Sequence, residues 1–230
     1  MAFYYLLLGH LIGDFVLQTD TIAEKKGRHL KWNMLHVLVV TLCIFIFAYP
    51  FGLLLSGMVL LNGAFHFALD HYKARIAEKL RLSGLAGFLL DQFLHILLLY
   101  IISWFAVGGS GHWLNFTAAK YLLVFTFVTS FSAVFTQFVL AALFRRNGGS
   151  FFEKGEKHVG ILARTYMAVV FYLSLILSPW YIFLLLGAAA VFFLQFKQEW
   201  DKWMNASQLA VKLLLDVVLS AGAVLLAVFL

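Results

Sequence analysis

Cysteine and charged residues are scarce in this sequence. Cys43 is the single cysteine among 230 residues. One cysteine cannot form a disulfide within the chain, and a structural zinc site built on paired thiolates is also excluded. Charged residues make up 12% of the chain, which is about half of their share in a typical soluble domain. This deficit excludes a soluble globular protein.

Long apolar runs take the place of the missing charge. Hydrophobic residues make up 63% of the chain and recur in runs long enough to cross a bilayer. The first run is the weakest, because His10 and Asp14 interrupt it, but it lacks the features of a removable signal peptide. Eight membrane-spanning helices are predicted, at residues 3–19, 32–49, 51–71, 85–107, 116–144, 160–177, 180–196 and 207–230.

These segments predict an all-α fold, a polytopic transmembrane bundle of about eight helices. Turn-forming residues separate several of the segments, at 49–50, 108–111, 147–150 and 178–179. No repeat or soluble insertion interrupts the pattern, so residues 1–230 are predicted to form one transmembrane domain. Within it, four helices in 1–107 carry the polar residues, and four in 116–230 support them.

The basic residues predict the orientation of the bundle. All but two of the 17 lysines and arginines fall on alternate connections or helix starts, the exceptions being Lys120 and Lys212. The positive-inside rule then places those connections in the cytoplasm and both termini outside. Because the basic residues are divided among membrane loops, a nucleic-acid partner is not expected. Lys212 and Asp216, four residues apart, are predicted to pair within the last helix.

Histidine and aspartate recur at helical spacing inside the apolar segments. Side chains four residues apart lie on one face of a helix, one above the other. Ionisable groups within a membrane span are costly, so they usually face a bundle interior and mark a site or a pathway. Three such pairs are present, with His36 between them in sequence: His10–Asp14, His66–Asp70 and Asp91–His95.

These residues are expected to meet at one depth. At about 1.5 Å per residue, Asp14, Asp70 and Asp91 lie roughly 5 to 9 Å from the cytoplasmic ends of their helices. Their histidine partners lie roughly 10 to 15 Å from the same ends, and His36 lies about one turn into its helix. All seven therefore fall in the cytoplasmic half of the membrane.

A set of four histidines and three aspartates is suited to a divalent metal. Imidazole and carboxylate ligands favour zinc, and also accept manganese or iron. The residues left over could orient the ligands or hold a second ion. His36, Asp14 and Asp91 are predicted to act in catalysis, with a spare aspartate as general base. The predicted metal ligands are His10, Asp14, His66, Asp70, Asp91 and His95.

Other polar residues border this layer and are predicted to bind substrate. Two lysines at the cytoplasmic interface could hold a phosphate or carboxylate headgroup, although they could equally be anchors that set topology. Gln137, on the fifth predicted helix, could instead be a hydrogen-bonding contact between helices. The predicted substrate-binding residues are Gln18, Lys26, Lys73, Gln92 and Gln137.

The motifs GHLIGDFVLQTDTIAEKK, FHFALDHYK and LLDQFLHILLL, together with His36, resemble a bacterial membrane family known as domain of unknown function three-three-zero-seven. The resemblance covers roughly the first hundred residues and implies a multi-pass protein of the bacterial cytoplasmic (inner) membrane. It implies no activity. The arrangement is also similar, in general layout only, to that of membrane-bound metal-dependent hydrolases. The family's recurrent positions correspond to His10, Asp14, Gln18, Lys26, His36, His66, Asp70, Lys73, Asp91, Gln92 and His95.

Three functions remain open at this point. The first is a metal-dependent intramembrane hydrolase or group transferase that takes a lipid or lipid-linked substrate from the cytoplasmic leaflet. The second is a divalent-cation or proton-coupled transporter that uses the same residues. Against it, the site is displaced to one side, and Asn62 and Asn115 are the only polar hints in the outer half. The third is a scaffold in which the polar layer only joins helices. The oligomeric state is not predicted.

Overall fold

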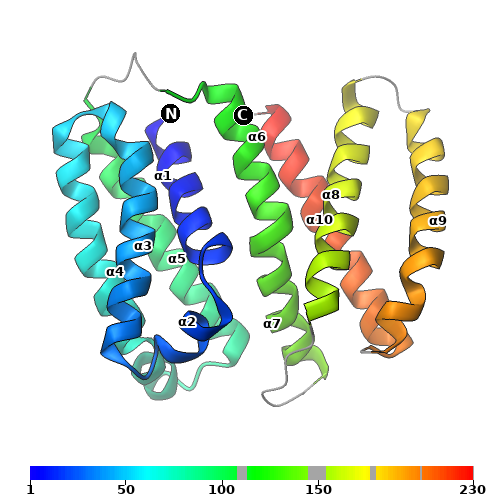
Figure 1. Ribbon diagram of the computed structural model, residues 1–230, viewed down its shortest axis with the longest axis horizontal. Helices are drawn as coiled ribbons and strands as arrows, with labels where there is room; N and C mark the ends of the chain where they lie inside the picture. The colour runs from blue at the N-terminus through cyan, green and yellow to red at the C-terminus, as the bar shows by residue number, and fades with distance from the viewer. Residues whose placement is uncertain (108–112, 145–153, 177–179, 203, 230) are drawn as a thin grey trace. The chain divides into compact units, whose positions relative to one another are not determined.

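The computed structural model describes residues 1–107, 113–144, 154–176, 180–202 and 204–229, and these are helical with no strand (Figure 1). The predicted all-α fold is confirmed for this part of the chain. The α-helices are α1 (Ala2–Leu11), α2 (Asp20–Lys25), α3 (Leu30–Ala48), α4 (Leu53–Lys79), α5 (Gly84–Ile102), α6 (Phe116–Thr126), α7 (Ser132–Phe144), α8 (Lys154–Ile176), α9 (Tyr181–Asp201) and α10 (Ala206–Phe229). Short π or 3-10 turns adjoin them, namely η1 (Ile12–Val16), η2 (Tyr49–Phe51), η3 (Ser103–Phe105) and η4 (Phe127–Phe131).

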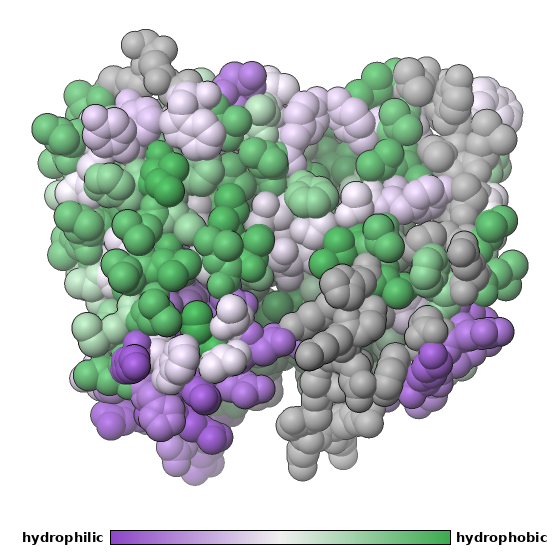
Figure 2. Space-filling model, viewed as in Figure 1, coloured by the Kyte–Doolittle hydropathy of each residue, from purple (hydrophilic) through white to green (hydrophobic). Residues whose placement is uncertain are grey.

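Several of these helices are suited to a bilayer. Among the described residues, six stretches are long and apolar enough to cross a membrane, and Ala2–Val16 is a shorter apolar helix. On α3, exposed Leu35, Leu38, Leu42 and Ile46 follow one helical face, as lipid-facing side chains do. Figure 2 shows hydrophobic side chains over most of α3 and α4, and hydrophilic ones at the end where α2 lies. The chain is therefore a multi-pass membrane protein.

Two of the predicted helix ends in the first unit differ from the structure, and one predicted break is confirmed. The first helix ends at Val16 in a π-turn, and the unpredicted α2 follows, with the Thr19 hydroxyl accepting from the Ile22 N–H at 3.4 Å. Helix α4 continues to Lys79, eight residues past its predicted end. The break predicted at 49–50 is confirmed by η2 and by Gly52, whose φ of 103° suits glycine. The turns predicted at 108–111, 147–150 and 178–179 lie wholly or largely outside the described residues.

The chain divides into two compact units, Met1–Thr126 and Phe127–Leu230. Their boundary falls inside the predicted helix at 116–144, where η4 separates α6 from α7. The prediction that all 230 residues form one domain stays a prediction. Each unit is described by itself below.

In the first unit, α3 packs against both α1 and α4, and α4 packs against α5. These four helices stand side by side in Figure 1, with alternating direction and α2 at one end. Tyr5, Ile44, Leu55 and Leu99, one from each helix, form part of a buried apolar core. Each of these residues lies on the side of the polar positions that faces away from α2. Apolar packing therefore fills one end of the unit, and the polar side chains meet near the other.

Small residues set the distance between α1, α3 and α4. A Cβ added to Gly9 would lie 2.7 Å from the Ile44 Cα, and one added to Gly13 would lie 2.7 Å from the Val40 Cα. On α4, a Cβ at Gly63 would lie 2.6 Å from the Thr41 Oγ1. Inside a membrane the hydrophobic effect does not drive helices together. Close packing of this kind drives their association instead. The glycines thus bring the backbones of all three helices close together beside the polar residues.

The second unit contains its own buried charged cluster. Arg164, one of the basic residues assigned to connections or helix starts, is buried within α8. Its guanidinium donates to the backbone oxygens of Val128 at 2.9 Å and Thr129 at 3.1 Å, in the π-turn η4. It also reaches Asp216 Oδ1 at 3.5 Å, and Asp216 pairs with Lys212 at 2.6 Å as predicted. A π-turn loosens the regular hydrogen bonding of a helix, so its carbonyls can serve Arg164.

Candidate functional site

The structure brings the six predicted metal ligands and His36 together inside the first unit. Two groups have ligand atoms that all lie within 4.8 Å of one another, Asp14 with His36 and His66, and His66 with Asp70 and His95. His66 belongs to both groups. All seven side chains are buried, with exposed fractions from 1% for His10 to 7% for Asp91. Their positions on α1–η1, α3, α4 and α5 make this cluster the meeting point of four helices.

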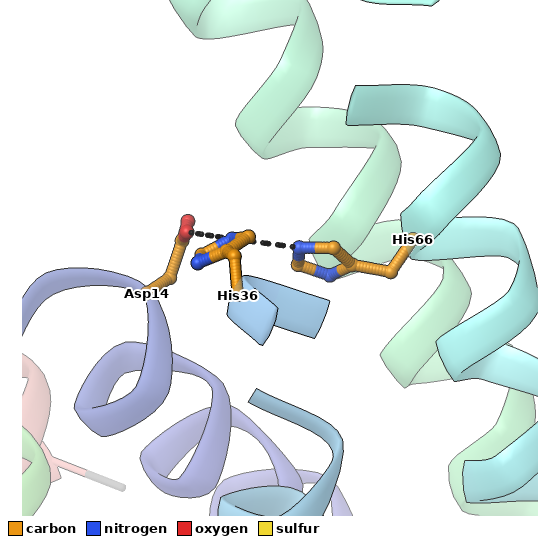
Figure 3. A group of neighbouring side chains, drawn as sticks. All are labelled: Asp14, His36 and His66. Atoms are coloured by element: carbon orange, nitrogen blue, oxygen red, sulfur yellow. Dashed lines mark hydrogen bonds and ion pairs between the residues drawn. The ribbon is translucent and has the colours of Figure 1, made fainter. Parts of the chain in front are cut away.

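His36 lies at the centre of the first group, between Asp14 and His66 (Figure 3). Its Nε2 is 3.1 Å from Asp14 Oδ1 and 3.3 Å from His66 Nε2. It is also 3.3 Å from Asp70 Oδ2. One ring nitrogen thus faces another imidazole and two carboxylates. It cannot serve all of them as a neutral group, because a neutral ring nitrogen either donates or accepts.

The remaining histidines adjoin this group from α1 and α5. The rings of His66 and His95 stack at a centroid distance of 4.0 Å, and His10 lies 5.4 Å from His95. The Nε2 atoms of His10 and His95 are buried and make no hydrogen bond with any described residue. A buried polar atom without a partner is costly, so these nitrogens call for a group that they can bind.

A divalent cation fits this donor set. Neutral imidazole and carboxylate are the ligands of zinc, manganese and iron sites. Each proposed ligand pair has the same internal arrangement, with a carboxylate beside its histidine partner: His10–Asp14 at 3.9 Å, His66–Asp70 at 3.6 Å and His95–Asp91 at 3.5 Å. In each pair the carboxylate faces the Nε2 atom of its histidine, so both members of a pair could ligate an ion that lies between them.

Lys26 reaches into the cluster from the residue after α2. Its ammonium lies 2.9 Å from His36 Nε2, 3.2 Å from Asp70 Oδ2 and 3.5 Å from Asp14 Oδ1. Burial by itself lowers the pKa of Lys26, but the charges of Asp14, Asp70 and Asp91 outweigh burial and raise this pKa above its ordinary value. Lys26 therefore stays a cation inside the cluster.

Asp91 has a separate set of partners at the edge of the cluster. Lys73 Nζ donates to Asp91 Oδ2 at 2.6 Å, and Gln92 Nε2 is 3.4 Å from the same oxygen. Gln92 Nε2 also donates to Asp14 Oδ2 at 3.2 Å. The amide of Gln92 thus joins the carboxylates of α5 and η1 and holds both in place.

Two predicted substrate-binding residues lie elsewhere. Gln18 was expected to continue the helical face of His10 and Asp14, but the helix ends at Val16, so Gln18 lies in the link to α2. Its Oε1 is buried and makes no hydrogen bond with a described residue. Gln137 lies on α7, in the second unit, and its role stays a prediction.

An open pocket lies between α4 and α5, directly beside Asp91 and Lys73. Apart from that ion pair its lining is apolar. The other lining residues are Leu69, Ile76, Ala77, Leu82, Gly87, Leu90 and Leu94. The pocket therefore has a charged end at the cluster and hydrophobic walls.

A family model described as Protein of unknown function (DUF3307) matches residues 2–125. The match covers more than half of the chain. The chain belongs to this family. No curated protein and no solved structure matches the chain.

The DUF3307 match coincides closely with the first unit, Met1–Thr126. It therefore contains every predicted site residue except Gln137, and it extends past the hundred residues of the motif resemblance to include most of α6. The family description gives no activity. The function of DUF3307 proteins must be argued from the chemistry of the cluster.

Two features of the site were not expected from the sequence. Asp14 lies in the π-turn η1, and nothing in the spacing of His10 and Asp14 separates a π-turn from an α-helix. Asn33, which is fully buried, donates through Nδ2 to the Phe67 oxygen at 3.2 Å and so ties α3 to α4 beside His66. Its position one turn before His36 is the only sequence signal for this role.

Proposed function

We propose that this protein is a metal-dependent intramembrane enzyme, a hydrolase or group transferase that acts on a lipid or lipid-linked substrate from the cytoplasmic leaflet. The observation that carries the proposal is the convergence of four buried histidines and three buried aspartates from four helices, with the Nε2 atoms of His10 and His95 left without partners among the described residues. A purely structural layer would be expected to satisfy its own buried nitrogens.

His66 is the central ligand of the proposed site, because it belongs to both donor groups. Asp70 and His95 complete one group, and Asp14 and His36 complete the other. When bound, a divalent ion would polarise a carbonyl or phosphoryl oxygen of the substrate and lower the pKa of water beside it. Zinc is the expected ion, with manganese and iron as alternatives.

The other residues would position and transfer protons. Asp91 holds His95 in orientation while Lys73 and Gln92 fix the Asp91 carboxylate. His36 Nε2 lies 3.1 Å from Asp14 Oδ1 and 2.9 Å from Lys26 Nζ, and these contacts could pass a proton to or from a reacting group. The contacts support the proposed catalytic roles of His36, Asp14 and Asp91.

The surroundings support an amphipathic substrate. Lys26, the residue after α2, reaches the site, and Figure 2 shows hydrophilic side chains at the end of the first unit where α2 lies. In a membrane, lipid headgroups and water would lie at that end. The pocket between α4 and α5 offers hydrophobic walls to a chain and the Lys73 ammonium to an anionic headgroup. An ion-transport function has less support, because Asn115, one of the two outer-half polar residues, caps α6 by accepting from the Ala118 N–H at 2.7 Å.

The test is the metal content of protein purified in detergent without a histidine tag. We expect one or more equivalents of metal in the wild type, and less than a tenth of an equivalent in His66→Ala. Asp91→Ala should also lose metal, because His95 loses its orienting partner. His71→Ala is the matched control, since His71 lies on the same helix, stacks on Phe67 and is exposed. Wild-type protein that takes up no metal when zinc, manganese or iron is supplied would contradict the proposal.

A further inference from the structure

The ammonium of Lys26 occupies a position among the donors that suits a metal ion. Three acceptors surround Lys26 Nζ: His36 Nε2 at 2.9 Å, Asp70 Oδ2 at 3.2 Å and Asp14 Oδ1 at 3.5 Å. An ammonium has three N–H donors, so it can serve all three at once. With Lys26 donating to it, His36 Nε2 has no lone pair left for an ion. This side of the cluster is therefore complete without metal.

The other side of the cluster is incomplete. His10 and His95 approach from α1 and α5, and no hydrogen bond to their Nε2 atoms is made by any residue that the structure describes. Their rings lie beside His66, at 5.8 Å for His10 and 4.0 Å for His95. His66, Asp70 and His95 form a donor group of their own. The donors that need a cation, His10 Nε2 and His95 Nε2, thus differ from the His36 and Asp14 atoms that Lys26 already serves, and Asp70 faces both sides.

We propose that the cluster binds a single divalent ion, on the side of His66, Asp70 and His95, and that the Lys26 ammonium takes the place of a second ion. This inference rests on the proposed metal-dependent function and decides between one ion and two. In a two-ion site, the second ion would serve Asp14 and His36, and Lys26 would have to leave. Here the chain supplies that positive charge itself.

The charge of the cluster agrees with one ion. Three carboxylates face two ammonium groups, those of Lys26 and Lys73. Metal ligation requires neutral histidines. The side chains alone therefore carry one excess negative charge. One divalent ion turns this into one excess positive charge. Two ions with the Lys26 ammonium displaced would leave two excess positive charges, and the larger buried excess is more costly.

One excess positive charge also specifies a class of substrate. A group with one negative charge would bring the occupied site to neutrality. Examples are a phosphodiester and the carboxylate that is released when an ester is hydrolysed. Lys73, which lines the pocket beside the cluster, would hold an oxygen of that group by charge-assisted hydrogen bonding. The structure thus favours a lipid headgroup with one negative charge over a dianionic or a neutral one.

The experiment is a zinc titration of the purified full-length protein, with bound zinc counted by mass spectrometry after removal of free metal. We expect one zinc per chain in the wild type and two in Lys26→Met, because the variant removes the ammonium and keeps a side chain of similar length. Lys25→Met is the matched control. Lys25 is the adjacent lysine, exposed and placed over the Trp32 ring, and its variant should keep one zinc.

The possible results separate this inference from the function on which it rests. Two zinc ions in the wild type, or one in a folded Lys26→Met protein, would overturn the single-ion arrangement and leave the metal site standing. No zinc in the wild type would overturn both. If Lys26→Met does not fold, Lys26→Gln tests the same point with another uncharged side chain, and the wild-type count remains decisive.

Discussion

At the scale of single residues, the two buried charged clusters of this chain differ in sign. In the first unit, Asp14, Asp70 and Asp91 outnumber the lysines that contact them. In the second unit, Arg164 and Lys212 share the one carboxylate of Asp216. An excess of buried carboxylate and imidazole invites a cation, while the excess cation in the second unit is met by backbone oxygens and an aromatic face. Only the first cluster therefore supports a metal site.

Arg164 is predicted to be essential for the stability of the second unit. In Arg164→Met, the backbone oxygens of Val128 and Thr129 lose a buried donor, and Asp216 loses one of two cationic partners. Breaking a buried ion pair by removing one partner costs about 3–5 kcal/mol. We expect a marked drop in the melting temperature of the protein in mild detergent.

The control for this change lies in the same unit. Lys197→Met removes an exposed partner of Asp201, and such surface pairs are worth about 0–1 kcal/mol. Its melting temperature should match the wild type. Equal melting temperatures for Arg164→Met and Lys197→Met would show that the buried network does not stabilise the unit.

At the scale of helices, the close approach of α1 and α3 controls the geometry of the site. We predict that Gly13→Ala pushes the two helices apart, because its Cβ would lie 2.7 Å from the Val40 Cα, a backbone atom that cannot rotate away. Overpacking of this kind costs about 1–3 kcal/mol. It would also move His10, which lies three residues before Gly13, away from His66 and His95, so zinc affinity should fall together with the melting temperature.

Gly57→Ala is the matched control for Gly13→Ala. Gly57 lies in α4, and a Cβ added there meets no atom within 4 Å. Its zinc affinity and its melting temperature should equal those of the wild type or rise slightly, since alanine favours a helix over glycine. Unchanged zinc affinity in Gly13→Ala would mean that the α1–α3 distance does not set the site.

The pocket between α4 and α5 gives a further prediction at this scale. Ala77→Phe would fill it from the α4 side and leaves every proposed ligand itself unchanged. Displacing about two methylene groups of a lipid chain costs about 1.6 kcal/mol, or roughly tenfold in affinity. We expect about tenfold weaker binding of phosphatidylglycerol, measured by native mass spectrometry, with metal content unchanged. Ala74 is exposed, lies three residues before Ala77 on α4 and does not line the pocket. Ala74→Phe should therefore bind lipid as the wild type does.

The sequence predicted the helices and the polar positions of the site well, for a physical reason. Apolar length alone identifies a membrane span, and a four-residue spacing alone places His66 and Asp70 on one face. The π-turn at Asp14 was not predictable, because it depends on how η1 packs against α3. The contact of Lys26 with His36 was not predictable either. It requires α2 to fold back toward the site, whereas the sequence of this connection is typical of a polar loop.

At the scale of the whole chain, the same limit applies to the buried contacts of Arg164. A basic residue near the start of a predicted helix is usually a topology anchor, and only the buried partners in η4 and α10 show otherwise. Removing Arg164 from the count leaves the charge asymmetry intact. Lys25, Lys26, Arg28 and Lys31 still follow the first helix, and Lys73, Arg75, Lys79 and Arg81 still gather at the end of α4. The prediction that these connections face the cytoplasm therefore does not depend on Arg164.

That orientation decides which leaflet supplies the substrate, and the scarcity of cysteine makes it easy to test. In a Cys43→Ala background, a cysteine at Lys79 marks the end of α4, and one at Thr117 marks the start of α6. Both positions are exposed. With a maleimide that cannot cross membranes, intact cells should label only Thr117→Cys, and Lys79→Cys should react only after the membrane is opened. Labelling of Lys79→Cys in intact cells would invert the topology and move the metal site to the outer leaflet, where the proposed substrate would have to be sought.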